Sequence, residues 1–202
     1  MKKRFLKTHT MKKHLPEGQV KLLLNMVFPN CDQNCVLVLG VGNYLMGDEG
    51  VGVHVAQRLA EYKLPPGAEV LDGGTGGFHL MGHFEQYEVV VLIDATIDGQ
   101  PGGTIRLLEP RFASDFPRSM STHDIGLRDV IEALQITGRM PKIYLITVSA
   151  VDLEPMTIHL SPPVQESVGQ IVNKLHTLLW DWWRERHLAS AAEAEEVLHA
   201  QV

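Results

Sequence analysis

Three side chains able to bind a metal or transfer a proton stand at loop positions beside segments expected to form the core. Glu49 and Asp94 each follow a short apolar run, and His123 precedes a helical pattern. Loops at one end of a parallel sheet converge in space, so residues distant in sequence can meet there. Two carboxylates and one imidazole suit a borderline divalent ion such as nickel or zinc, and leave coordination positions open for a substrate.

Each of these residues also has an ordinary structural explanation. Glu49 can stabilise the positive end of a helix, which contributes less than about 1 kcal/mol at an exposed position. Asp94 can be a turn residue whose carboxylate accepts backbone hydrogen bonds. His123 can be a surface histidine near a helix start. Spacing alone therefore leaves the metal site a hypothesis.

Apolar runs that alternate with helical patterns predict the elements that position these side chains. The run 89–93 is continuously apolar, as expected of a central parallel strand buried on both faces. The pattern predicts an α/β fold with three layers, in which helices cover both faces of a twisted, mainly parallel five-stranded sheet. The expected strands are 36–39, 68–71, 89–93, 104–108 and 143–148, and the expected helices are 50–62, 78–85, 127–135 and a last helix from Pro162 to about 180–183.

Length and composition indicate one globular domain with two appended ends. The chain has 202 residues, and we place the domain at 35–186. Residues 1–34 are basic and are expected to form a loosely ordered extension. Residues 187–202 are rich in Ala and Glu and are expected to be a solvated helix or disordered.

Charge, cysteine content and hydropathy exclude several classes of protein. A net charge of −6 gives no reason to expect nucleic acid as a partner. The two cysteines, Cys31 and Cys35, are expected to be plain thiols in a reducing compartment. No apolar run reaches the length of a membrane span, so we expect no membrane association and a cytoplasmic location.

Two glycine-rich loops raise the alternative of a nucleotide or phosphate site. Gly40-Val41-Gly42 lacks the third glycine of a dinucleotide fingerprint at the required spacing. The run 72–77, Asp-Gly-Gly-Thr-Gly-Gly, lacks the Lys-Ser/Thr pair of a P-loop. Its glycines are better suited to let a ligand or peptide backbone approach closely. No GxSxG elbow is present, which disfavours a serine hydrolase.

Four motifs together resemble the nickel–iron hydrogenase maturation endopeptidases. The first is long and specific, and all four follow the order in which they occur in that family. They are VLGVGNYLMGDEGVG at 38–52, LDGGTGG at 71–77, IDA at 93–95 and STHDIGL at 121–127. The resemblance covers the chain from about Cys35 to the last helix.

The resemblance implies an aspartic-type endopeptidase that activates another enzyme. Such proteases remove a short carboxy-terminal peptide from the precursor of a hydrogenase large subunit after nickel insertion. The metal-contacting and catalytic residues of the family fall on Glu49, Asp94 and His123. Nickel would arrive with the precursor, so no permanent cofactor is expected, and the protein would be a monomer or a weak dimer. The implied substrate-binding residues are Gly42, Asn43, Asp48, Gly73, Gly74, Thr75 and Gly76.

Two other functions stay open at this point. The chain could be a nickel-sensing chaperone that binds the hydrogenase precursor and cuts nothing. It could also be an α/β enzyme that binds a nucleotide or phosphate through its glycine loops. The sequence does not decide whether nickel is catalytic or only a recognition signal, nor which carboxylate acts as general base.

Overall fold

A five-stranded sheet forms the centre of the protein. The computed structural model describes residues 35–110, 127–138 and 140–199, with side chains up to His187. The strand order is β2-β1-β3-β5-β4, and the bounds are β1 Val36–Val41, β2 Ala68–Gly74, β3 Val89–Thr96, β4 Ile105–Leu108 and β5 Lys142–Ser149. The first four strands in this order pair in parallel, and β4 pairs antiparallel to β5. The predicted mainly parallel sheet is confirmed.

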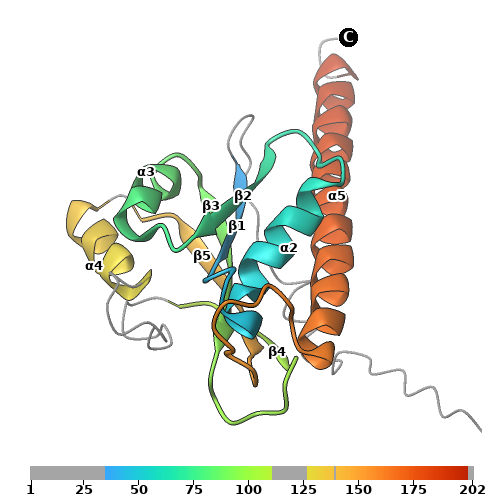
Figure 1. The fold of residues 1–202 in the computed structure, drawn as a ribbon. Helices are drawn as coiled ribbons and strands as arrows, with labels where there is room; N and C mark the ends of the chain where they lie inside the picture. Colours follow the sequence, from blue (N-terminus) through green and yellow to red (C-terminus); the bar gives the residue numbers. More distant parts are fainter. Residues whose placement is uncertain (1–34, 111–126, 139, 200–202) are drawn as a thin grey trace, which may run out of the picture.

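Helices cover both faces of this sheet and complete three layers (Figure 1). The helices α2 and α5 lie on one face, and α3 and α4 lie on the other (Figure 1). Their bounds are α2 Val51–Ala60, α3 Met81–Phe84, α4 Leu127–Thr137 and α5 Pro162–His199, with short 3-10 turns η1 at Gly47–Gly50 and η2 at Gly77–Leu80. Among the described residues no helix has the length and apolar content needed to cross a membrane.

Strand alternation divides the apolar side chains into two cores. Val91 and Ile93 of β3 belong to the core under α2 and α5, whereas Val90 and Leu92 belong to the core under α3 and α4. Because successive strand residues point to opposite faces, a strand that serves both cores must be apolar throughout. This explains why the uninterrupted apolar runs of β1, β3 and β5 could be recognised in the sequence.

Helix α2 lies unusually close to the sheet because glycine stands at the contact. A Cβ atom on Gly52 would lie 2.3 Å from the carbonyl oxygens of both Val41 and Ile93. A Cβ on Gly40 would lie 2.0 Å from the carbonyl oxygen of Gly52. These two glycines therefore bring the amino-terminal end of α2, and the η1 turn before it, against the ends of β1 and β3.

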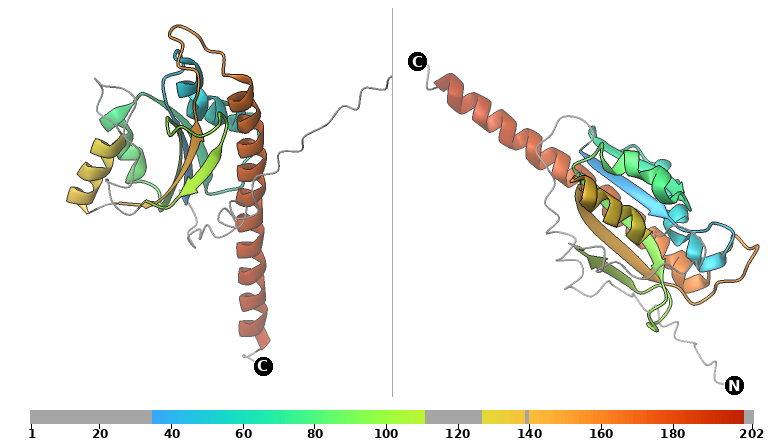
Figure 2. Two further views of the ribbon diagram at one scale, coloured as in Figure 1. Left: turned by 90° about the horizontal axis from the view of Figure 1, so that it is seen from below. Right: turned by 90° about the vertical axis from the view of Figure 1, so that its left-hand side faces the viewer.

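The last helix differs from its prediction. Helix α5 continues to His199 instead of ending near 180–183, and its carboxy-terminal half projects beyond the sheet (Figures 1 and 2). Alanine and glutamate are strong helix formers, so no residue between Trp183 and His199 interrupts the helix. Of the two states expected for the Ala/Glu-rich tail, the helical one is observed up to His199.

Cys35 also differs from its prediction. It is fully buried ahead of β1 and is disulfide-bonded, so the expected free thiol is wrong at this residue. Sequence spacing does not fix the separation of two cysteine Cβ atoms, which decides whether a disulfide can form. The other cysteine, Cys31, and the rest of the expected basic extension lie outside the described residues.

Candidate active site

Glu49 and Asp94 meet at the carboxyl end of the sheet. Asp94 lies near the end of β3, and Glu49 lies in the η1 turn that follows β1. Both side chains are half-buried, and the charge of Glu49 acts on Asp94. Their roles as catalytic and metal-binding residues stay a prediction. The third predicted member, His123, lies outside the described residues, so the complete triad stays a prediction.

The environment of Asp94 favours its neutral form. Burial, with a smaller contribution from the negative charge of Glu49, raises the pKa of the Asp94 carboxyl to about 7. The backbone N–H of Ala95, which donates to Asp94 Oδ1 at 2.8 Å, opposes this rise in pKa. A carboxyl group with a pKa near neutrality can exchange a proton at physiological pH, which is what general acid–base catalysis requires.

Asp48, the neighbour of Glu49, is a structural anchor. Its side chain is 0% exposed, and its two oxygens accept four hydrogen bonds. The donors are the backbone N–H groups of Val151, Asp152 and Ser161 and the Ser161 hydroxyl, at 2.7–3.0 Å. The carboxylate is engaged within the protein, so this arrangement gives no support to the predicted contact between the Asp48 side chain and substrate.

The segment 150–161 is the partner of this anchor and was not singled out from the sequence. Its backbone pairs with the η1 region through Gly47 N–H to Thr157 O at 3.0 Å and Thr157 N–H to Leu45 O at 3.2 Å. The His54 ring on α2 contacts the Ile158 carbonyl oxygen through Nε2 at 3.0 Å. Burial lowers the pKa of His54. These contacts hold the loop that carries Glu49 in place.

The two glycine loops lie next to each other. The N–H of Gly42 donates to the Gly74 carbonyl oxygen at 2.9 Å, and both glycines have positive φ, +136° and +48°. A Cβ on Gly42 would lie 2.0 Å from the Glu49 carbonyl oxygen, so this glycine is required by the internal packing. Around Gly74 the nearest atom to such a Cβ is Asp72 Oδ1 at 4.0 Å. Open space therefore surrounds Gly74, as a substrate-binding loop requires.

The remaining predicted substrate-binding residues occupy the same edge of the sheet. Asn43 shapes its own turn, because its Oδ1 accepts the Leu45 N–H at 3.0 Å. Thr75 is exposed, and Gly73 and Gly76 are half-buried. The N–H of Gly76 bonds to the Gly73 carbonyl oxygen at 2.9 Å and closes the turn. Their contact with a substrate stays a prediction.

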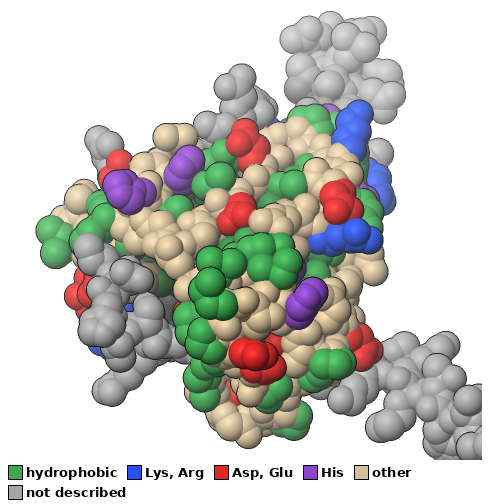
Figure 3. Space-filling model, in the orientation of Figure 1, with side chains coloured by type: hydrophobic (Ala, Val, Ile, Leu, Met, Phe, Trp, Pro, Cys, Tyr) green, Lys and Arg blue, Asp and Glu red, His purple; other side chains and the backbone are tan. Residues whose placement is uncertain are grey.

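Exposed apolar side chains surround this edge. Five of them come from the three loops that follow β1, β3 and β5. Their exposed fractions are 51% for Leu45, 61% for Ile97, 60% for Val151, 85% for Met156 and 42% for Ile158. Figure 3 shows hydrophobic side chains with acidic and histidine groups among them in the lower half of the view. Such an apolar rim is suited to contact with another macromolecule.

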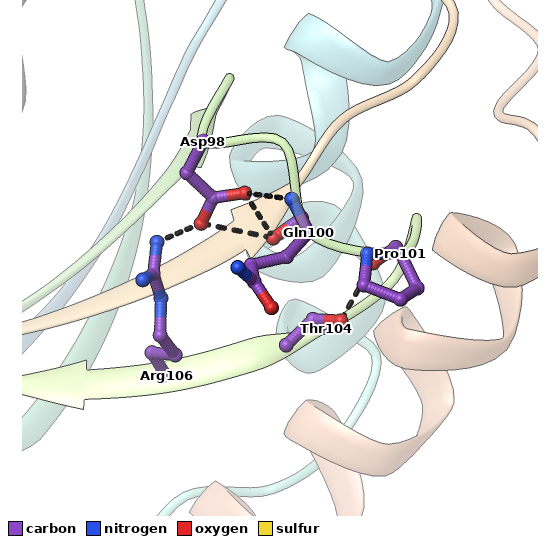
Figure 4. A network of polar contacts seen from close by, with 6 residues as sticks. Asp98, Gln100, Pro101, Thr104 and Arg106 are labelled. Carbon is purple, nitrogen blue, oxygen red and sulfur yellow. Dashed lines mark hydrogen bonds and ion pairs between the residues drawn. The ribbon is translucent and has the colours of Figure 1, made fainter.

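A polar network ties the loop after β3 to the two neighbouring strands. Asp98 accepts hydrogen bonds from the Ser149 hydroxyl at 2.9 Å and the Gln100 N–H at 3.0 Å. The Arg106 guanidinium on β4 pairs with the same carboxylate through Nη2, and Thr104 bonds to the Pro101 carbonyl oxygen (Figure 4). This network fixes Arg106 beside the carboxyl end of the sheet.

No group of three or more histidine, cysteine, aspartate or glutamate side chains in the described part of the chain is arranged to hold a metal ion. Glu49 and Asp94 could provide two carboxylate donors to a metal ion. With the imidazole of His123 they would suit a borderline divalent ion such as nickel, and this ligand set stays a prediction.

Comparison with known proteins places these features in a family. Residues 53–177 match the family model described as hydrogenase maturation protease. The hydrogenase expression/formation protein HupD of Bradyrhizobium diazoefficiens is 34% identical, with coverage of 82% of this chain and 89% of that protein. The hydrogenase 2 maturation protease of Escherichia coli is 38% identical, with coverage of 66% and 83%. The solved structure of the hydrogenase maturating endopeptidase HybD from E. coli has a TM-score of 0.65 and 35% identity, with coverage of 72% and 92%.

Proposed function

The chain belongs to the hydrogenase maturation protease family, and from this premise we propose that it removes a short carboxy-terminal peptide from the nickel-loaded precursor of a nickel–iron hydrogenase large subunit. The observation that carries the proposal is the meeting of Glu49 and Asp94 at the carboxyl end of a parallel sheet. His123 is proposed as the third member of the site. Nickel belongs to the substrate in this proposal.

Electrostatics give a reason for selecting the nickel-loaded precursor. Burial and the charge of Glu49 disfavour ionisation of Asp94, so two charged carboxylates at this position are costly without a cation. A divalent ion carried by the precursor would compensate this cost and favour the charged form of both side chains. A precursor without nickel brings no such compensation and would bind more weakly.

The chain's own groups suggest how a peptide bond would be cut. Asp94, with its pKa of about 7, is the proposed general base that accepts a proton from the attacking water. Glu49, whose three companions in η1 are buried while it is only half-buried, would contact the metal centre of the precursor. The backbone N–H and carbonyl of Gly74 are engaged by Asp72 and Gly42, so we propose that the extended carboxy-terminal tail of the substrate passes over the side of Gly74 where a Cβ would stand, which is free of close contacts.

The test is the mass of a nickel-loaded large-subunit precursor, taken from the same cells, before and after incubation with the protein. We expect loss of a short carboxy-terminal peptide with the wild-type protein and no loss with a nickel-free precursor. Glu49→Gln, Asp94→Asn and His123→Ala should each abolish cleavage. Stable binding of the precursor without any loss of mass would instead identify the protein as a nickel-sensing chaperone. The cytoplasmic location and the monomeric or weakly dimeric state stay predictions.

A further inference from the structure

Two buried polar side-chain atoms on β5 and β4, in line with Asp94 on β3, have no hydrogen-bond partner among the described residues. They are the hydroxyl of Thr147, a residue only 1% exposed, and Nε of Arg106. A buried polar atom without a hydrogen bond destabilises a folded protein, so such atoms in native structures call for an explanation. Neither atom has a role in the network around Asp98, which uses Nη2 of Arg106.

Strand register places these two residues in one row with Asp94. Thr147 of β5 is the register partner of Asp94 on β3, and Arg106 of β4 is the register partner of Thr147. Neighbouring parallel strands lie about 4.8 Å apart, so the three side chains form a row across three strands.

The burial pattern shows that all three side chains point to the same face of the sheet. Leu92 precedes Asp94 by two residues and Leu145 precedes Thr147 by two residues, and both belong to the core under α3 and α4. Leu108, two residues after Arg106, packs against the same core. Because side chains alternate between faces, Asp94, Thr147 and Arg106 share this face. On this face of β3 and β5, the side chains are apolar up to Leu92 and Leu145 and become polar at Asp94 and Thr147.

We propose that Thr147 is a positioning residue for Asp94. A threonine hydroxyl can donate one hydrogen bond and accept others. Thr147 would accept from Nε of Arg106 and donate to the ionised Asp94 carboxylate, whose Oδ1 already accepts the Ala95 N–H. Asp98 holds the Arg106 guanidinium in place (Figure 4). The row would therefore run from a fixed cation through the Thr147 hydroxyl to the Asp94 carboxyl.

Packing alone gives no reason for a hydroxyl at this position. Of the neighbours of Thr147 on the same face of β5, Leu145 is apolar and Ser149 bonds to Asp98, so neither offers the Thr147 hydroxyl a partner. Valine has nearly the same shape as threonine and would fill the same space. Thr147→Val would remove an unpartnered buried hydroxyl and should leave the melting temperature unchanged or raise it. A residue that costs stability is consistent with a role in the reaction.

The inference rests on the proposed function, and its test compares Thr147→Val with Thr147→Ser. We expect Thr147→Val to lower kcat for cleavage of the nickel-loaded precursor about tenfold or more, with KM changed less than twofold. Thr147→Ser, which keeps the hydroxyl, should restore most of the activity. Thr177→Val is the matched control, because it removes an exposed hydroxyl on α5 that bonds to the Asn173 carbonyl oxygen. The control should cleave like the wild type.

A second readout does not depend on cleavage. The ¹³C chemical shift of the Asp94 carboxylate, measured at pH 8.5 in the full chain, should change in Thr147→Val and return in Thr147→Ser. An unchanged shift together with wild-type kcat in Thr147→Val would overturn the inference. Loss of kcat together with a lower melting temperature, without rescue by serine, would show a packing role and also overturn it. If the wild type cleaves no precursor, the proposed function fails, and the chemical shift alone decides the role of Thr147.

Discussion

Replacing Asp94 with asparagine should stabilise the protein while abolishing its activity, and the gain should depend on pH. The folded-state pKa of Asp94 is about 7, above its ordinary value of 3.8. The folded protein therefore binds more protons at this position than the unfolded chain between these values. Stability is lost as pH rises through this window and stays low above it. Asparagine removes the titrating group and keeps the oxygen that accepts the Ala95 N–H.

The size of the effect follows from the shift in pKa. One pKa unit corresponds to about 1.4 kcal/mol, so the raised pKa of Asp94 lowers the free energy of unfolding by at most about 4 kcal/mol at pH 8 and about 1.5 kcal/mol at pH 5, relative to low pH. The side chain is only half-buried, so screening by water makes the real cost smaller than this ceiling. For a protein of this size, 1 kcal/mol corresponds to a change of about 2–4 °C in melting temperature.

The assay is thermal unfolding of wild type and Asp94→Asn between pH 5 and pH 8, with a chelator present to keep metal ions away from the site. We expect the melting temperature of the variant to exceed that of the wild type by several degrees at pH 8 and by less at pH 5. Asp181→Asn is the control, because this exposed carboxylate pairs with Arg184 on the same helix. A difference between Asp94→Asn and wild type that is the same at both pH values would refute the electrostatic argument.

Three further predictions concern the anchor, the helix contact and the glycine loop. Asp48→Ala leaves three backbone N–H groups and a hydroxyl without their acceptor, so the free energy of unfolding, measured in urea, should fall by about 3–5 kcal/mol. A decrease of less than about 1 kcal/mol would exclude an anchoring role for Asp48. Gly52→Ala should lower the melting temperature by about 10 °C or more, because its Cβ would overlap two carbonyl oxygens. Gly82→Ala is the control, because a Cβ at Gly82 would have no atom within 4 Å. Equal melting temperatures of the two variants would contradict the close contact at Gly52. Gly74→Ala should lower the free energy of unfolding by about 1–2 kcal/mol, because Gly74 has a positive φ. It should also lower kcat/KM for cleavage of the precursor. Unchanged cleavage would show that this loop is not part of the substrate site.

The central strands, and the placement of Glu49 and Asp94 at one edge of the sheet, could be predicted because they depend on local sequence patterns. The apolar runs of β1, β3 and β5 predict the central strands. Glu49 and Asp94 follow two neighbouring parallel strands, whose carboxyl ends lie at the same edge of the sheet. The role of Asp48 could not be predicted, since its partners lie more than 100 positions later in a segment without regular structure. Sequence also gives no register between β3 and β5, so Thr147 could not be recognised as the neighbour of Asp94.

The hydrogen bonds of Asp48 have a consequence for the order in which the protein folds. They join positions 103, 104 and 113 residues apart, so the turn that carries Glu49 can be fixed only after β5 and the segment following it are in place. Contacts at such separations form slowly, because a long loop must close before any of them contributes. A chain still being synthesised would therefore hold β1 and β3 without a finished site between them. The active site would therefore be completed only after the central strands have paired.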